Sequence, residues 1–274
     1  VRNIYGISRV NIQNEGWEPS ALNIPLKIKM GEEPKVVAVI NDLQMPFHDQ
    51  SAVELVENFL REIQPDILLY NGDIMDYYQI SDFDKDPARI GNLQSDIDQV
   101  KAMFRHYKIN LPNARKIMID GNHEKRLQHF LWAKAPEISS LKCLTIEELF
   151  NLGEYKIEHI AYEQGLMING IFLILHGDIA SIHSGYTAKR MFEKHGGCGI
   201  CGHCHRMGSF YKRDRFGIWG WWENGCLCHL NPDWVKNPNW TQGFSLIHFL
   251  GDRFWVEQIP IISGKMMYGG KIYG

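Results

Sequence analysis

The chain has 274 residues, of which 45% are hydrophobic, so it is long enough to bury a sizeable core and to fold as one large domain. Its formal net charge of −3 gives no overall attraction to nucleic acid or to an anionic membrane, although a local basic groove is compatible with that charge. Because the chain has no apolar run long enough to cross a membrane, no signal-peptide pattern and only six cysteines, we expect a soluble protein of a reducing cytoplasm.

Three segments are predicted along the chain. Residues 1–34 contain three prolines and several Asn and Gly residues, so we expect an irregular N-terminal extension. The main folded domain is expected over residues 35–262, and residues 263–274 are glycine-rich, which predicts a loosely held C-terminal tail.

A repeated pattern begins at residue 35: short apolar runs, typical of buried strands, end abruptly in polar residues. The runs cover residues 36–40, 67–70, 116–119, 171–175 and 199–201, and the polar clusters after them are Asn41-Asp42, Asn71-Gly72-Asp73, Gly121-Asn122-His123-Glu124, His176-Gly177-Asp178 and Gly202-His203-Cys204-His205. Helical spacing of apolar residues follows two of the runs, over residues 51–63 and 92–107. Alternating strands and helices predict an α/β domain whose polar clusters converge at the carboxyl ends of the strands.

The part of the chain after residue 205 changes character. Strand-like runs without long helices cover residues 209–212, 216–223, 244–250 and 254–261, so this half is expected to be β-rich.

The polar clusters supply oxygen and imidazole ligands, which suit manganese, iron and zinc and argue against a pure calcium site. The candidates are Asp42, Asp73, Asn122, His176, His203 and His205. A single Asp or Asn after a strand is usually a turn or cap residue, so only the ordered set carries the interpretation. A carboxylate such as Asp73 can bridge two ions about 3.5–4 Å apart, an arrangement suited to phosphoryl transfer.

In order, the motifs are Asp-x-Gln, Gly-Asp, Gly-Asn-His-Glu, His-Gly and Gly-His-x-His, and this order resembles the calcineurin-like metallophosphoesterases over roughly residues 36–260. The resemblance implies a four-layer α/β/β/α sandwich that binds two divalent ions. It assigns one ion to Asp42, Gln44, Asp73 and His205, and the other to Asp73, Asn122, His176 and His203.

The resemblance also implies catalytic roles for two residues. His123 would protonate the leaving oxygen after in-line attack on phosphorus. Asp76, three residues after Asp73, stands where the protein phosphatases of this superfamily have the aspartate that orients the histidine. The alternative role for Asp76 is that of a helix cap.

Gln44 departs from the family pattern, which usually has histidine there. An amide oxygen is harder than imidazole, so we expect weaker binding of the first ion and a preference for manganese, with magnesium, iron, zinc or nickel as alternatives. The Asp-x-Gln form is similar to phage-encoded members, which implies the cytoplasm of a bacterium or of a phage-infected host. It also supports the alternative of a non-catalytic binding scaffold.

Three further residues are candidates for substrate contacts. His48 could replace the missing histidine or contact phosphate, with a satisfied loop histidine as the alternative. Arg126 could clamp a phosphate, although an arginine near a helix start is often merely solvated. His183 follows the His176 cluster closely enough to reach a substrate.

The motifs do not specify the phosphoester, and two features bear on it. Five tryptophans near three basic residues could stack bases and neutralise phosphates, with core packing as the alternative. They are Trp219, Trp221, Trp222, Trp234 and Trp240, near Lys212, Arg213 and Arg215. Tyr77-Tyr78 stands where protein phosphatases have Arg-Gly, which disfavours that class. We therefore expect a DNA nuclease, exonuclease-like and resembling the repair nucleases that commonly form homodimers, with a small-molecule or nucleotide phosphatase as the alternative.

A structural zinc site is the alternative use of the cysteines. Cys198, Cys201 and Cys204 are spaced by two residues, and Cys226-x-Cys228 follows. Cys198 and Cys201 are also typical of small residues buried on a strand.

Overall fold

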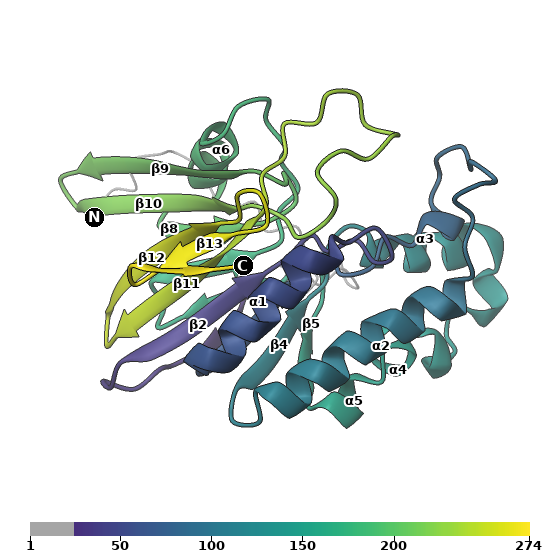
Figure 1. Ribbon diagram of the computed structural model, residues 1–274, viewed down its shortest axis with the longest axis horizontal. Coiled ribbons are helices and arrows are strands. Elements are labelled where there is room, and N and C mark those ends of the chain that lie inside the picture. Colours follow the sequence, from purple (N-terminus) through teal and green to yellow (C-terminus); the bar gives the residue numbers. More distant parts are fainter. Residues whose placement is uncertain (1–24) are drawn as a thin grey trace, which may run out of the picture.

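A computed structural model describes residues 25–274, and these fold as two six-stranded sheets between layers of helices (Figure 1). The first sheet has the order β12 (Arg253–Pro260), β11 (Gly243–Leu250), β2 (Lys35–Ile40), β3 (Ile67–Asn71), β4 (Arg115–Ile119), β5 (Ile157–Ile160). The second has the order β1 (Leu26–Ile28), β6 (Leu166–Ile168), β7 (Phe172–Leu175), β8 (Cys198–Cys201), β10 (Gly217–Asn224), β9 (Met207–Asp214). Strands β2 to β5 are parallel, so their carboxyl ends lie at one edge.

The helices cover the outer faces of the sheets. On the first sheet lie α1 (Gln50–Ile63), α2 (Leu93–Asn110), α4 (Ile146–Leu149) and α5 (Leu152–Tyr155), while α6 (Tyr186–His195) covers the second sheet (Figure 1). Helix α3 (Glu124–Lys134) follows β4, and short 3₁₀ turns occupy η2 (Tyr78–Ile80), η3 (Pro136–Ile138) and η4 (Lys142–Leu144). Both helices predicted from apolar spacing are confirmed, as α1 and α2.

Alternation along β2 shows how the layers are held together. Val37 and Val39 point into the core between the sheets, whereas Ala38 and Ile40 point into the core under the helices. All four side chains are fully buried. A strand buried on both faces has to be apolar throughout, which is why the short apolar runs identified these strands. The predicted α/β/β/α sandwich is confirmed.

Both chain ends differ from the prediction where the structure describes them. Residues 1–24 of the expected extension lie outside the described residues, but Leu26–Ile28 form β1 and pair in parallel with β6. The expected loose tail is instead a hairpin of β13 (Met266–Tyr268) and β14 (Lys271–Tyr273). Apolar side chains between the glycines fix it: the rings of Tyr268 and Tyr273 each lie 5.1 Å from that of Phe59 on α1.

Among the described residues, no helix combines the length and the apolar character needed to span a bilayer.

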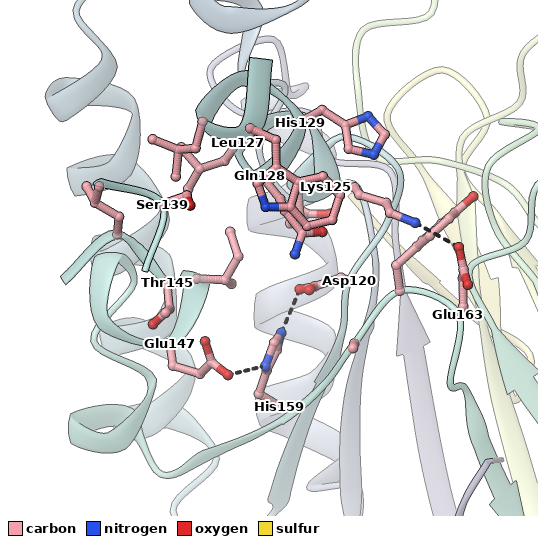
Figure 2. A pocket seen from close by; sticks show the side chains of 17 residues that line it. Asp120, Lys125, Leu127, Gln128, His129, Ser139, Thr145, Glu147, His159 and Glu163 are labelled. Carbon is pink, nitrogen blue, oxygen red and sulfur yellow. Dashed lines mark hydrogen bonds and ion pairs between the residues drawn. The ribbon is translucent and has the colours of Figure 1, made fainter. Parts of the chain in front are cut away.

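An ion cluster ties β5 to α4. His159 on β5 donates from Nε2 to Asp120 Oδ1 and from Nδ1 to Glu147 Oε1, both at 2.8 Å (Figure 2). Burial disfavours the charged ring, but the two carboxylates outweigh burial and raise the pKa of His159 to about 9.

This cluster predicts a pH-dependent stability. The pKa of His159 is higher in the folded chain than the value of about 6.5 expected after unfolding, so the stabilisation is complete below about pH 6.5 and lost as pH rises through 9. We expect wild type to lose up to about 3 kcal/mol more unfolding free energy between pH 6.5 and 9 than His159→Gln. Urea unfolding at both pH values measures this, with the exposed His106→Gln as control. Equal losses in wild type and His159→Gln would contradict it.

Candidate metal centre

The predicted ligands come from five separate loops, and the fold brings them to one place. Asp42 follows β2 and Asp73 follows β3, Asn122 follows β4, His176 follows β7, and His203 and His205 follow β8. These loops belong to both sheets, so the centre lies where the two meet.

One group of ligand atoms belongs to Asp42, Asp73 and His205, which all lie within 4.8 Å of one another. His205 Nε2 is 3.1 Å from Asp42 Oδ1 and 3.2 Å from Gln44 Nε2. Exchanging the amide oxygen and nitrogen of Gln44 by a half-turn of its side-chain amide would place the oxygen beside His205 Nε2. Gln44 therefore reaches the centre despite not being a histidine.

A second group belongs to Asp73, His176 and His203, again within 4.8 Å. Asn122 joins it, because its Oδ1 lies 2.7 Å from His203 Nδ1 and 3.2 Å from His176 Nε2. Asp73 is the member shared by both groups, which is the position that a carboxylate bridging two ions requires.

The donor set fits two divalent cations. Asp42, Asp73 and His176 are at most 1% exposed, and Asp42 Oδ1 faces the His205 ring at 3.1 Å. Buried carboxylates are costly unless positive charge neutralises them, and a bound cation would supply that charge. Burial disfavours protonated imidazole, yet Asp42 raises the pKa of His205 to about 10, and Asp73 does the same for His176. Carboxylates strong enough to hold protons there would hold cations in their place.

The backbone of the centre is held in an uncommon conformation. Five of the seven predicted ligand residues have positive φ angles between 51° and 67°, a region that costs non-glycine residues about 1–3 kcal/mol each. They are Asp42, Gln44, Asp73, His203 and His205. Strain concentrated on residues that share one centre is typical of a functional site.

Glycines next to the ligands let the loops approach closely. A Cβ atom on Gly121 would overlap both the side chain and the backbone nitrogen of Asp73. We therefore expect Gly121→Ala to lower the unfolding free energy by at least about 2 kcal/mol and to weaken Mn²⁺ binding at least tenfold. Urea unfolding and titration calorimetry measure these effects. Gly153→Ala is the matched control, because its Cβ meets no atom within 4 Å; similar behaviour of the two variants would refute the prediction.

Glu124 supports the loops after β3 and β4, which carry Asp73 and Asn122. The sequence motifs did not predict this role. Its Oε2 accepts from the N–H groups of Asp73 (2.9 Å) and Gly121 (2.7 Å), and its Oε1 accepts from those of Ile74 (2.9 Å) and Met75 (3.2 Å). Burial, followed by the charges of Asp73 and Asp120, raises its pKa to about 7. One side chain thus holds together the loops after β3 and β4.

The structure brings His123 and Asp76 together. His123 Nδ1 lies 3.0 Å from the carbonyl oxygen of Asp76 and 3.4 Å from its Oδ2, while Nε2 lies 3.6 Å from Asp73 Oδ2. Burial disfavours the protonated ring, but Asp73 and Asp76 outweigh it and raise the pKa of His123 above its ordinary value. Asp76 caps no helix, because η2 begins two residues later with Tyr77 at its N-cap.

The three candidate substrate residues lie in different environments. Arg126 is bound rather than solvated: it donates to Asp76 O (2.7 Å) and Oδ1 (3.1 Å), and its NH2 is 3.1 Å from His123 Nε2. His48 Nε2 faces Gln50 Oε1 at 2.8 Å, and the exposed His183 packs edge-on against Tyr186. Within residues 25–274 no hydrogen bond or ion pair joins His48 or His183 to a predicted ligand.

Four of the five predicted tryptophans form two pairs, while Trp219 is half-buried on β10 and its Nε1 donates to Asp214 Oδ2 at 2.9 Å. Trp221 and Trp222 are buried, as the core alternative expects, whereas Trp234 is 42% exposed and Trp240 packs edge-on against the His205 ring at 4.3 Å. The predicted basic residues do not lie beside Trp234 and Trp240. Lys212 follows His205 by seven residues along β9, roughly 23 Å of extended chain, and Arg213 and Arg215 lie further still.

The cysteines also divide. Cys198 and Cys201 are buried on β8, and among the described residues neither they nor Cys204 belong to a group that could hold a metal ion. Cys226 and Cys228 lie within 4.8 Å of a His205 ring nitrogen, with Cys228 Sγ 3.8 Å from Nδ1. They therefore lie beside the ring edge that faces away from Asp42.

Two facing sheets between helices, with Asp, Asn and His side chains converging at the strand ends, define a metallophosphoesterase. The sequence profile described as "Calcineurin-like phosphoesterase" matches residues 35–253, so the chain belongs to this family and is a metal-dependent phosphoester hydrolase.

The relatives include phage proteins, in line with the predicted resemblance. The chain is 25% identical to the Gene 54 protein of Mycobacterium phage D29, over 87% of this chain and 98% of the relative. The Gene 54 protein of phage L5 is 24% identical with the same coverage. Among solved structures, Vps29 of Cryptosporidium parvum is 12% identical with a TM-score of 0.46, covering 85% of this chain and 95% of that one. Zinc-complexed Vps29 of Entamoeba histolytica has a TM-score of 0.45 and 12% identity, covering 85% and 96%.

Proposed function

We propose that this hydrolase is a manganese-dependent DNA nuclease of the exonuclease-like kind. The observation that carries the proposal is an aromatic rim beside the metal centre, made of Phe47, Tyr78, Trp234 and Trp240. Such a rim suits a substrate with several bases better than a bare phosphate monoester.

The rim starts at the ligands themselves. Phe47 lies three residues after Gln44, its ring 4.8 Å from that of Trp234 and 6.0 Å from that of Tyr78. Trp240 packs on His205. Exposed aromatic faces stack bases of any sequence, with about 1–3 kcal/mol for each base.

Cations accompany the rim, although not the ones predicted. Arg89 lies 5.0 Å over the Trp234 ring, and Lys85 lies 5.5 Å over that of Tyr78. Arg89 is also paired with Asp86 at 3.2 Å and with Asp233 at 3.0 Å, whereas no ion pair joins Lys85 to a carboxylate among the described residues, so Lys85 is the cation available to a phosphate there. Local charge of this kind is what a phosphate backbone needs.

The chemistry assigns roles to the residues of the centre. Bound divalent ions would polarise the phosphoryl group and generate the attacking nucleophile from water. Asp42, Gln44, Asp73, Asn122 and the three predicted histidine ligands would hold them. His123, whose pKa Asp73 and Asp76 raise, would donate a proton from Nε2 to the leaving oxygen. The Arg126 guanidinium faces that nitrogen at 3.1 Å and would turn from it to bind a phosphoryl oxygen of the substrate.

Manganese is the proposed ion because Gln44 replaces an imidazole by an amide oxygen. The first ion would then be held by Asp42, Gln44, Asp73 and His205, an oxygen-rich set that favours hard ions.

We also propose that the chain forms a homodimer, as the resemblance to the repair nucleases implies. Light scattering on the same sample tests this.

The test is a cleavage assay on chelated protein with Mn²⁺, Mg²⁺, Zn²⁺ or Ni²⁺ added back. Labelled single- and double-stranded DNA are compared with bis(p-nitrophenyl) phosphate and p-nitrophenyl phosphate. We expect Mn²⁺-dependent DNA cleavage that Trp234→Ala lowers at least fivefold without affecting the small esters. Trp255→Ala, on the exposed side of β12, is the control. Turnover of small esters alone would replace the nuclease by a small-molecule phosphatase.

A further inference from the structure

A cavity of about 420 Å³ lies next to the metal centre, between α3, α4 and the end of β5 (Figure 2). Side chains of α3 project into it from one side, and the Asp120–His159–Glu147 cluster faces them from the other. Its volume falls within the range of about 300–1,000 Å³ that is typical of small-molecule sites. None of the predicted ligands or catalytic residues lines it.

The cavity shares its wall with the metal centre. Asp120 lies two residues before Asn122, and Glu124 lines the cavity while its carboxylate holds the loops that carry Asp73 and Gly121. Tyr162, another lining residue, has its ring 6.3 Å from that of His176. A molecule whose phosphate lies at the centre could therefore place a neighbouring group here.

The sides of the cavity are apolar and its rim is aromatic. Leu127, Leu131, Leu144 and Ile146 form the sides. At the rim the His129 and Trp132 rings stack at 5.9 Å with an interplanar angle of 26°, and Trp132 is 57% exposed. Apolar sides below an exposed ring suit a flat aromatic ligand.

Two of the polar groups that line the cavity, Asp120 and Glu147, are carboxylates with accepting positions left over. His159 engages one oxygen each of Asp120 and Glu147, and a carboxylate offers about four lone-pair positions, so both can accept further hydrogen bonds. Four carboxylates line the cavity, against Lys125, which is paired with Glu163, and His159. This excess of negative charge disfavours phosphate and favours a ligand that donates hydrogen bonds.

We propose that the cavity binds the base of a nucleotide and prefers bases that carry an exocyclic amine, such as adenine and cytosine. The amine donates to Asp120 and Glu147, and the ring lies between the leucine side chains. The assignment extends the proposed nucleic-acid substrate, because it supplies a base site beside the phosphoester.

The experiment measures nucleoside binding by titration calorimetry on the full chain with chelator present, so that no turnover is involved. Adenosine is compared with inosine and cytidine with uridine, since each pair differs in the amine but hardly in shape. We expect at least tenfold tighter binding of the amine-bearing member. Glu147→Gln should lower that preference at least tenfold, and Leu131→Trp should block binding. Glu148→Gln, the exposed neighbour on α4, should change nothing.

Several outcomes would overturn the base site: no binding of any nucleoside, equal binding within each pair, or a preference that survives Glu147→Gln. Binding of arginine amide but of no nucleoside would also overturn it, because the cavity would then recognise a guanidinium group and not a base. The result is independent of the nuclease proposal. DNA cleavage without nucleoside binding refutes only the base site, whereas amine-selective nucleoside binding without DNA cleavage refutes only the nuclease.

Discussion

Replacing His123 by alanine is expected to slow hydrolysis of phosphodiesters with poor leaving groups by about 10²- to 10⁴-fold. The reason lies in the geometry: Nδ1 is held by Asp76, Nε2 faces the centre, and two carboxylates raise the pKa of the ring. A p-nitrophenolate leaves without needing a proton. The variant should therefore keep most of its activity on bis(p-nitrophenyl) phosphate while losing activity on DNA or on an alkyl phosphodiester.

This contrast separates proton donation from metal binding. Mn²⁺ affinity of His123→Ala, measured by calorimetry, should change far less than activity on the poor leaving groups. His106→Ala, at an exposed position of α2, is the control for loss of a histidine. An equal loss on all substrates would assign His123 to substrate or metal binding instead.

The fold was predictable because its central strands β2, β3, β4 and β8 are short and buried on both faces. Such strands have to be apolar throughout and have to end where the chain reaches the solvent-facing edge, so their limits are visible in sequence. The same logic led to the candidate ligands, since the polar residue after each strand in a parallel sheet lies at one edge. Gln44 could be placed for this reason although its residue type is unusual.

Features that depend on contacts between distant residues were not predictable. Glu124 bonds the backbone of residues 50 positions earlier, and backbone donors leave no mark on composition. The burial of the tryptophans was not predictable. Strand β10 buries Trp221 and Trp222, whereas Trp234 and Trp240 lie on a loop that brings Trp240 against His205. The C-terminal hairpin needs Phe59, which lies some 200 residues away in sequence.

Glu124→Ala is expected to be the most destabilising single change at the centre, lowering the unfolding free energy by at least about 3 kcal/mol. Alanine would leave four backbone N–H groups without their acceptor, in loops that are fully buried. The loops carry Asp73 and Asn122, so Mn²⁺ affinity should also fall about 10- to 100-fold.

Glu124→Gln tests whether the carboxylate itself matters. Its amide oxygen can replace one carboxylate oxygen, but its NH₂ group would face two N–H donors, so we expect a loss intermediate between wild type and Glu124→Ala. Urea unfolding measures both variants, with Glu137→Ala on the exposed face of η3 as control, within about 0.5 kcal/mol of wild type. A loss below about 1 kcal/mol for Glu124→Ala would show that the loops hold their shape without this side chain. The left-handed backbone at Asp73 argues against that outcome, since a strained loop persists only where its surroundings hold it in place.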